Sequence, residues 1–292
     1  MFQPVDSPYL IPFDASTRVE DLAAHPGKAE VGKKEARERL EDCVEELADL
    51  QRSLYADNRH ALLLVFQAMD AAGKDSTIRA VMSGINPAGF QVTSFKRPSA
   101  RELDHDFLWR TTRALPERGR IGIFNRSHYE ETLVVRVHPG ILDGQRLPWR
   151  SPEEEFWQER FASIRDHERH LARNGTVVLK FWLNVSREEQ ARRLLARLDR
   201  PEKRWKFEAG DVRERRHWDA YMSAYEDVLN ETSRAWAPWY AIPADDKPTM
   251  RLRVAEIFLA TLRALDLKRP ELDSGELENE PALRRELEEG LE

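Results

Sequence analysis

The sequence predicts an α/β fold in which helices cover both faces of a central parallel sheet. The most apolar run in the chain, residues 61–66, has the length of a strand and polar segments on both sides, as expected of a strand buried on both faces. Three more apolar runs of strand length follow at 91–95, 120–124 and 176–183. Charged segments with helical periodicity separate them, and this alternation is typical of βαβ units in one doubly wound domain.

The remaining elements are predicted from periodicity. Residues 33–58 carry apolar side chains at helical spacing within a charged segment, which indicates an amphipathic helix. Residues 239–242 are a weaker candidate for a fifth strand. Further segments have helical patterns, namely 74–84, 101–114, 153–173, 187–198, 211–231 and 248–266.

The two ends of the chain differ from its middle in composition. Residues 1–30 are rich in Pro, Asp and small residues, and we expect them to form an extended N-terminal arm. Residues 270–292 contain nine acidic residues and two arginines. We therefore expect 269–292 to be a solvated acidic tail with one frayed helix, interrupted by Pro281. A single domain remains between these ends, at 31–268.

The composition excludes several classes of protein. Of 292 residues, 41% are hydrophobic and 34% charged, and the formal net charge of −6 argues against a general nucleic-acid-binding protein. The single cysteine, Cys43, excludes an internal disulfide framework and a four-cysteine zinc site. No apolar run approaches the ~18 residues of a membrane span, and the first residues lack the pattern of a signal peptide. We expect a soluble, cytoplasmic protein without a membrane or nucleic acid as partner.

The segment after the first predicted strand has the pattern of a phosphate-binding loop. Residues 68–75 match G-x-x-x-x-G-K-[ST], with Ala68 at the first glycine and Asp75 at the hydroxyl residue. A strand precedes it and a helix follows, as this loop requires, so that backbone N–H groups and the Lys74 charge can surround a phosphate. The alternative is an ordinary strand–turn–helix with an exposed lysine. The expected phosphate contacts are Ala71, Ala72, Gly73, Lys74, Asp75 and Ser76.

Acidic residues close to this loop suggest a magnesium site. Asp70 would repel a bound phosphate unless a cation lay between them, which suggests a magnesium ligand or a positioning group; a helix N-terminal acid is the alternative. In P-loop enzymes a carboxylate near the end of a neighbouring strand helps to hold magnesium. Here the strand ends at Asn125, and the acids are Glu130 and Glu131. Arg126 is placed to neutralise charge on the transferred group, although these residues also suit a polar helix start.

A basic segment lies downstream. Residues 192–216 contain ten Lys and Arg residues and five acids. Such a run can be merely a solvated face, but after a P-loop it predicts a lid over phosphates, at about 196–216. Ten cations exceed what one triphosphate needs and suit a longer, chain-like polyanion. The expected contacts to that polyanion are Lys203, Arg204, Lys206 and Arg213.

Several motifs occur together in one order. They are MDAAGK at 69–74, KRPS at 96–99, HDFLWR at 105–110, FNRSHYEE at 124–131, KRWKF at 203–207 and APWYAIPAD at 237–245, followed by Lys247. In these motifs the chain resembles the polyphosphate kinase 2 family over about residues 30–268. The resemblance implies a thymidylate-kinase-like P-loop fold, a three-layer sandwich with a helical lid. It also implies phosphoryl transfer from inorganic polyphosphate to nucleoside mono- and diphosphates, with Mg²⁺, or Mn²⁺ in its place, as cofactor.

The resemblance also implies roles for single residues. It places Lys74 in the phosphate loop, gives Asp70 a catalytic or magnesium-positioning role and gives Arg126 a phosphate contact. Glu130 and Glu131 complete the expected catalytic and metal set. The form of the 125–130 segment resembles the subgroup that acts on both AMP and ADP, giving ADP and ATP. The expected nucleotide contacts are Lys96, Arg97, Asp106, Arg110, Asn125 and Arg126.

The sequence departs from the family pattern at two positions, and the resemblance implies two further expectations. Ala68 replaces the usual glycine, which matters little if its φ is negative, and Glu131 replaces the usual aspartate, which lengthens the carboxylate arm. Guanine nucleotides are further candidate substrates. A homo-oligomer, a dimer or tetramer, is the expected assembly.

The expected chemistry needs no strong general base, because the phosphate of the acceptor is already ionised at neutral pH. We therefore favour polar packing or phosphate hydrogen bonding for His105 and His128 over acid–base catalysis. Cations must overcome the repulsion between two polyanions and hold attack in line. Two other functions stay open: an ATP-dependent nucleoside or nucleotide kinase, and a non-enzymatic module that binds polyphosphate or nucleic acid.

Overall fold

Five strands form one parallel sheet in the computed structural model, which describes residues 2–27, 31–270 and 274–291. The strands are β1 (Ala61–Gln67), β2 (Phe90–Ser94), β3 (Ile121–Asn125), β4 (Thr176–Asn184) and β5 (Trp239–Pro243). Their order is β2-β3-β1-β4-β5, and every neighbouring pair is parallel. The five predicted strands are thus confirmed, with ends that differ by one residue at most.

The first strand occupies the centre of the sheet, as its apolar sequence predicts. All residues of β1 are buried, and Leu64 is paired with Ile123 on one side and with Leu179 on the other. A strand with neighbours on both edges and helices on both faces has no solvent-facing side, so an uninterrupted apolar run is stable there.

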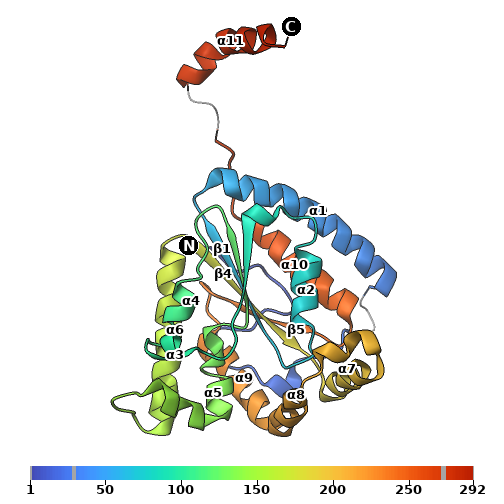
Figure 1. Cartoon of the computed structure of the whole chain (residues 1–292), viewed down its shortest axis with the longest axis vertical. Coiled ribbons are helices and arrows are strands. Elements are labelled where there is room, and N and C mark those ends of the chain that lie inside the picture. The colour runs from blue at the N-terminus through green and yellow to red at the C-terminus, as the bar shows by residue number, and fades with distance from the viewer. Residues whose placement is uncertain (1, 28–30, 271–273, 292) are drawn as a thin grey trace.

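Helices cover both faces of the sheet, which confirms the predicted three-layer sandwich (Figure 1). One layer contains α1 (Lys33–Asp57), α2 (Lys74–Val81) and α10 (Lys247–Arg263); α10 packs against both of the others. The opposite layer contains α6 (Glu153–Arg173) and α9 (Trp218–Thr232), which pack against each other.

Two predicted helices are interrupted in the structure. Residues 101–114 form two short helices, α3 (Ala100–Leu103) and α4 (Trp109–Thr112). The Asp106 carboxylate accepts a hydrogen bond from the backbone N–H of Leu108 at 2.9 Å, a local turn that competes with helix continuation. Residues 211–231 are likewise divided, between α8 (Ala209–Glu214) and α9. A four-residue helix, α5 (Val134–Val137), was not predicted.

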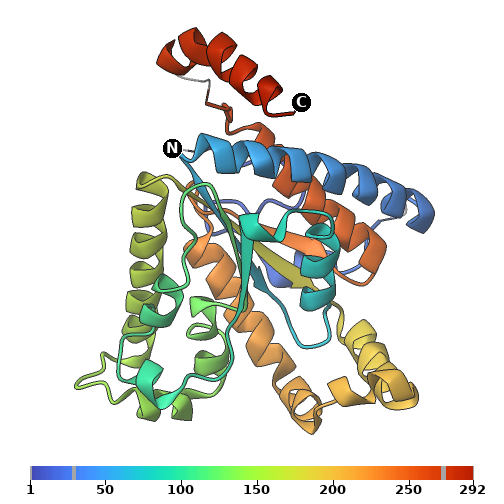
Figure 2. The same cartoon turned by 45° about the horizontal axis from the view of Figure 1, so that its top comes forward.

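The basic segment forms a helical projection beyond the carboxyl edge of the sheet (Figure 2). It consists of α7 (Arg187–Asp199), a 3₁₀ turn at Pro201–Lys206, and α8. The N-terminal segment lies beside β5, the strand at one end of the sheet. There the Ile11 N–H donates to the Trp239 carbonyl and the Ala241 N–H donates to the Tyr9 carbonyl, so that residues 9–11 cover β5.

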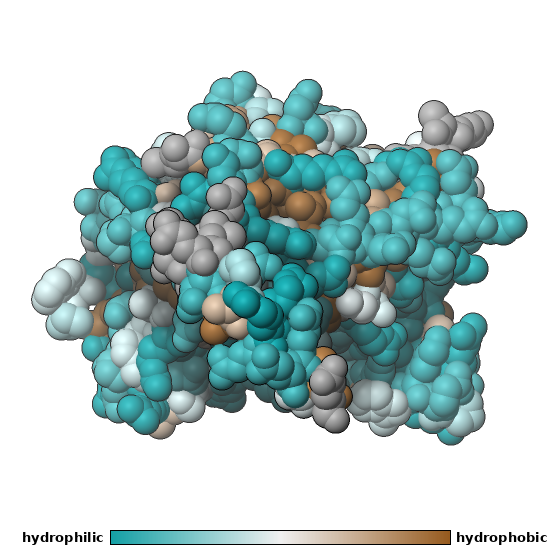
Figure 3. Space-filling view, turned by 90° about the horizontal axis from the view of Figure 1, so that it is seen from above, coloured by the Kyte–Doolittle hydropathy of each residue, from teal (hydrophilic) through white to brown (hydrophobic). Residues whose placement is uncertain are grey.

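The C-terminal tail contains helix α11 (Ser274–Glu289), which lies at the end of the molecule away from the basic projection (Figure 1). The helix continues through Pro281, which has no backbone N–H to donate to an intrahelical hydrogen bond. The face seen from above is largely hydrophilic (Figure 3). None of the described helices is long and apolar enough to cross a membrane.

Candidate active site

The segment between β1 and α2 forms a tight loop. Ala71 and Gly73 have φ angles of 59° and 113°, in the left-handed region. A Cβ at Gly73 would lie 3.3 Å from the Met250 Cε, so both conformation and space favour glycine. Ala68 is not among the described residues with positive φ, and an alanine there is therefore unstrained. The first N–H groups of α2, those of Lys74, Asp75 and Ser76, have no partner within the helix and can face an anion.

Lys74 lies inside this loop. Its Nζ donates a hydrogen bond to the Ala68 carbonyl at 2.7 Å. Burial and the positive charge of Arg126 lower the pKa of the Lys74 ammonium, although three nearby carboxylates act in the opposite direction. The ammonium is thus held against the first residue of the loop.

Asp70, Arg126 and Glu130 come together beside the loop. The Arg126 guanidinium lies 3.0 Å from the Asp70 Oδ1 and 3.7 Å from the Glu130 Oε2. Burial by itself would lower the pKa of Arg126. The carboxylates of Glu130 and Asp70 outweigh it and raise the pKa above its ordinary value. Gln67 at the end of β1 donates to the Glu130 Oε1 at 3.1 Å. Two carboxylates therefore share one guanidinium at the carboxyl edge of β1 and β3.

Glu131 does not join this cluster. One of its oxygens accepts from Arg160 Nε at 3.0 Å, and the other accepts from Gln145 Nε2 at 2.7 Å. The side chain is buried, and burial raises the pKa of its carboxyl group. Both carboxylate oxygens thus have protein partners on α6 and on the 3₁₀ segment Pro139–Gln145, away from the loop.

The residues expected at a nucleotide site lie on the side of β2 and β3. Asn125 donates to the Asp75 Oδ1 at 2.5 Å, which connects the end of β3 to the start of α2. Lys96 and Arg97 are exposed after β2, and Arg110 donates to the Lys96 carbonyl at 2.7 Å. The Asp106 carboxylate forms the turn before α4 instead.

The structure separates the basic segment into two groups. Arg193, at the start of the basic segment 192–216, is buried and donates to the Ala72 and Ala244 carbonyls at 2.6 Å each, so it holds the loop against the turn before α10. The expected polyanion contacts are different. Lys206, Arg204 and Arg213 are exposed and Lys203 is half-buried.

The basic projection lies close to the loop. Gln190 on α7 donates to the Asp70 carbonyl at 2.9 Å. On α8, burial and the negative charge of Asp70 raise the pKa of the Asp211 carboxyl group. Helices α7 and α8 of the projection are therefore both next to the candidate site, as expected of a lid.

Comparisons with known proteins show the family of this chain. The sequence model of the family described as polyphosphate kinase 2 (PPK2) matches residues 30–270. The chain belongs to this family. It is 55% identical over 271 residues to the ADP-polyphosphate phosphotransferase of Rhodopseudomonas palustris, covering 91% of each chain. It is 46% identical to the AMP/ADP-polyphosphate phosphotransferase of Meiothermus ruber, covering 86% of this chain and 89% of the relative.

A solved PPK2 structure supports the fold. The crystal structure of polyphosphate kinase 2 from Arthrobacter aurescens superposes with a TM-score of 0.85 at 35% identity. The match covers 97% of this chain and 99% of that one. The α/β architecture predicted from the sequence is therefore a PPK2 architecture over nearly the whole length.

Several residues that contact this candidate site were not predicted from the sequence. Gln67 donates to Glu130, and Gln190 donates to the Asp70 carbonyl. Tyr225 on α9 is buried, and burial together with the Glu130 charge raises the pKa of its phenol. No spacing marked these residues, since each depends on a contact between distant segments.

The histidines pack rather than face the loop. The His105 ring stacks on Trp109 with centroids 3.8 Å apart. His128 is buried, 3.6 Å from Glu168. Beneath it, Lys180 on β4 donates to the Glu168 Oε2 at 2.6 Å and to the Tyr129 hydroxyl at 2.8 Å. These contacts agree with the polar-packing interpretation.

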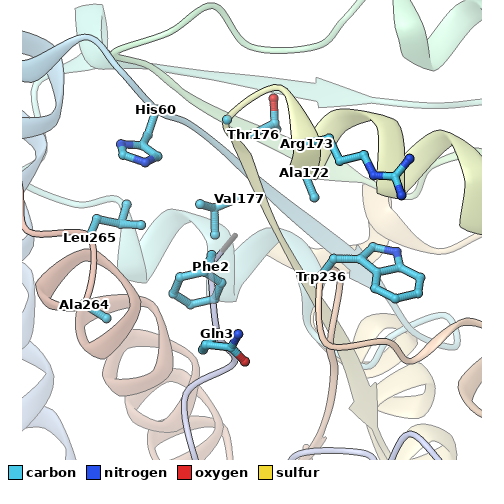
Figure 4. Close-up of a pocket in the computed structure, with 11 residues that line it drawn as sticks. Phe2, Gln3, His60, Ala172, Arg173, Thr176, Val177, Trp236, Ala264 and Leu265 are labelled. Carbon is cyan, nitrogen blue, oxygen red and sulfur yellow. The ribbon is translucent and has the colours of Figure 1, made fainter.

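A separate hollow lies at the amino edge of the sheet (Figure 4). Its lining includes His60 before β1, Thr176 at the start of β4, and Trp236. None of the loop residues lines it, so this hollow is separate from the candidate site.

Proposed function

We propose that this protein transfers phosphoryl groups from inorganic polyphosphate to AMP and ADP. The observation that carries the proposal is the Asp70–Arg126–Glu130 cluster beside Lys74, in a chain whose relatives are named polyphosphate phosphotransferases. A P-loop alone suits any phosphate donor. The basic lid beside it, with more cations than a triphosphate needs, favours a polyphosphate chain.

Charge and position supply the catalysis. Lys74 and the N–H groups of α2 would hold the phosphate that is attacked, and Arg126 would meet the charge that develops on it. The Asp70 and Glu130 carboxylates keep the Arg126 guanidinium in place at 3.0 and 3.7 Å. The acceptor phosphate is already an anion, so no residue has to remove a proton from it.

We propose Mg²⁺, or Mn²⁺ in its place, as the cofactor, held by Asp70 and Glu130. The described residues contain no group of three or more His, Cys, Asp or Glu side chains that could hold a metal on their own. This fits Mg²⁺, which is commonly bound through one or two carboxylates plus substrate phosphates and water. When bound, the ion would neutralise phosphate charge. We leave Glu131 out of this set because it is buried and paired with Arg160 and Gln145, away from the loop, whereas Glu130 shares the Arg126 guanidinium with Asp70 beside the loop.

One assay tests the function against its alternatives. Purified protein with magnesium and ADP should form ATP when polyphosphate is the donor. An ATP-dependent kinase would instead phosphorylate AMP or a nucleoside from ATP and leave polyphosphate unused. A binding module would hold polyphosphate and transfer nothing. Either of these two results would refute the proposal.

The lid is proposed at about 196–216, with Lys203, Arg204, Lys206 and Arg213 toward the donor. Changing Lys203, Arg204 and Lys206 together to Gln should raise the KM for polyphosphate and leave the KM for ADP nearly unchanged, because chain affinity depends on summed charge contacts. Exposed cations at the amino edge provide a matched control, Arg52→Gln with Arg118→Gln and Lys268→Gln. Loss of ADP affinity with normal polyphosphate affinity would show that the lid faces the nucleotide.

We further propose that both AMP and ADP are acceptors, at a site that includes Lys96, Arg97, Arg110 and Asn125, and that guanine nucleotides are candidates. The two relatives differ here, since one is named for ADP alone and the other for AMP and ADP. Polyphosphate with AMP should give ADP and then ATP. ADP as the only product, after long incubation without contaminating adenylate kinase, would leave an AMP-specific enzyme. Cytoplasmic location and a dimer or tetramer stay predictions from the sequence.

A further inference from the structure

The segment that carries Arg126 and Glu130 contains a strained residue. Arg126 has a φ angle of 63°, in the left-handed region that residues with a side chain rarely adopt. The 3₁₀ turn His128–Glu130 follows, and its Glu130 carboxylate lies 3.7 Å from the Arg126 guanidinium. A strained backbone persists only where the surrounding contacts fix it. The placement of these two side chains therefore depends on how the turn is anchored.

Tyr129, the middle residue of this turn, is anchored in the core. Its side chain is fully buried, and its ring packs edge-on against Trp239 with centroids 4.8 Å apart. The Tyr129 hydroxyl donates to the Glu168 Oε1 on α6 at 2.8 Å and accepts from the Lys180 Nζ on β4 at 2.8 Å. Burial and the Glu168 charge raise the pKa of the Tyr129 phenol, so the hydroxyl keeps the proton that it donates.

Lys180 and Glu168 form an ion pair inside the core. Their side chains are 0% and 1% exposed, and the Lys180 Nζ donates to the Glu168 Oε2 at 2.6 Å. The same ammonium donates to the Thr232 carbonyl at the end of α9 at 2.8 Å, so that all three of its donors are used. Burial by itself would raise the pKa of Glu168, but the Lys180 charge outweighs it and holds the pKa below its ordinary value.

This ion pair contributes more to direction than to stability. The cost of removing two charges from water can exceed their attraction, and apolar side chains of similar volume fill a core without that cost. Hydrogen bonds to charged groups are, however, short and strong. Here they hold the Tyr129 hydroxyl at one point between α6, β4 and α9.

We infer that Tyr129, Lys180 and Glu168 are positioning residues of the transfer reaction, which hold the turn so that Arg126 and Glu130 face the phosphate loop. The inference rests on the proposed function and identifies what keeps its site in shape. All three side chains are buried, so they act through the backbone of the turn and not by contact with a substrate. Glu130 follows Tyr129 directly in the chain, and its carboxylate in turn orients the Arg126 guanidinium.

The variant Tyr129→Phe tests this role, because it removes one hydroxyl and keeps the ring. It should lower kcat about tenfold, since misplaced groups lose contacts to the reacting phosphate. The KM for ADP and for polyphosphate should stay within about twofold, because the loop and the lid are unchanged.

Tyr240→Phe is the matched control. The Tyr240 hydroxyl, on β5, donates to the Val5 carbonyl at 3.0 Å and has no part in the turn. Its removal should lower the Tm about as much as Tyr129→Phe does and leave kcat unchanged. A fall in kcat in both variants or in neither, or a change confined to KM, would overturn the inference.

Hydrogen exchange of the backbone separates this test from the proposed function. The Arg126 N–H donates to the Phe66 carbonyl at 3.0 Å, and the Glu130 N–H donates to the Ser127 carbonyl at 3.2 Å. In Tyr129→Phe both amides should exchange at least about threefold faster than in wild type, and in Tyr240→Phe at the wild-type rate. These rates do not depend on whether the protein transfers phosphate. Unchanged exchange of residues 125–131 in Tyr129→Phe would refute the positioning role.

A second variant covers the case that Tyr129→Phe folds poorly. Lys180→Met combined with Glu168→Gln removes both charges of the pair together, so that neither is left buried alone. It should lower kcat about as much as Tyr129→Phe, with the same small change in KM. A wild-type kcat in this double variant would show that the turn does not depend on the pair.

Discussion

Replacing Arg193 by Met tests whether this residue supports the P-loop or belongs to the lid. Its guanidinium donates to the carbonyls of two segments, the loop and the turn before α10. The distances are 3.3 Å to Ala71, 2.6 Å to Ala72, 2.6 Å to Ala244 and 3.0 Å to Asp245. Met keeps much of the side-chain volume and removes every donor, so carbonyls in a nearly enclosed site would lose their partners.

The size of the effect follows from these bonds. A hydrogen bond to a charged group contributes roughly 1.5–3 kcal/mol, so loss of the two shortest bonds should lower the free energy of unfolding by about 3–6 kcal/mol. For a domain of this size that is a fall in Tm of roughly 10 °C. We also expect a loss of kcat/KM of at least about tenfold, because misplacement of the loop weakens contacts to the reacting phosphate.

Urea unfolding and steady-state kinetics measure the two effects. The neighbouring Arg192 is a matched control, since its side chain is 70% exposed and pairs only with Glu189 among the described residues. Arg192→Met should change the free energy of unfolding by less than about 1 kcal/mol. If Arg193→Met were as mild as Arg192→Met, the loop would not depend on Arg193, and the residue would act as a lid cation.

Three other substitutions have definite expected outcomes. Lys74→Ala should abolish transfer while the Tm stays within a few degrees, because the change removes a charge directed at phosphate and little core volume; transfer within a few-fold of wild type would exclude Lys74 from a phosphate loop. Lys180→Met should lower the free energy of unfolding in urea by about 3–5 kcal/mol, because it leaves the Glu168 carboxylate buried and without its cation. Adding Glu168→Gln to this variant should recover part of that loss. Equal stability of Lys180→Met and wild type would contradict this. Lys247→Met should be at least as stable as wild type near neutral pH, because the pKa of Lys247 in the folded protein, about 8, lies below the usual value. Between about pH 8 and 10 the unfolded chain binds a proton that the folded chain has lost. The wild type should therefore gain stability relative to the variant as the pH rises through this range. Unfolding curves at both ends of that range check it, and a gap that widens in favour of the variant as pH rises would refute it.

The sequence by itself determined the sheet and the tight loop after its first strand. Both depend on local signals: a strand buried on both faces needs an unbroken apolar run, and a loop with left-handed turns needs Gly73 next to Lys74. Order along the chain then implied parallel strands, because each strand was followed by a helix long enough to return. The interruptions near Asp106 and Arg215 were not predicted, since a helical pattern does not reveal where a side chain or a change of direction ends the helix.

Only the tertiary structure decided which charged residues lie together at the candidate site. Glu130 and Glu131 are neighbours in sequence, yet one faces Arg126 and the other is paired with Arg160 on α6. Within one run of basic residues, Arg193 is buried beneath the loop while Arg192 is exposed. The physical reason is that the direction of a charged side chain is set by the partner available to it. Those partners, on α6, after β3, in the loop after β1 and in the turn before α10, are brought close only when distant segments pack against the sheet.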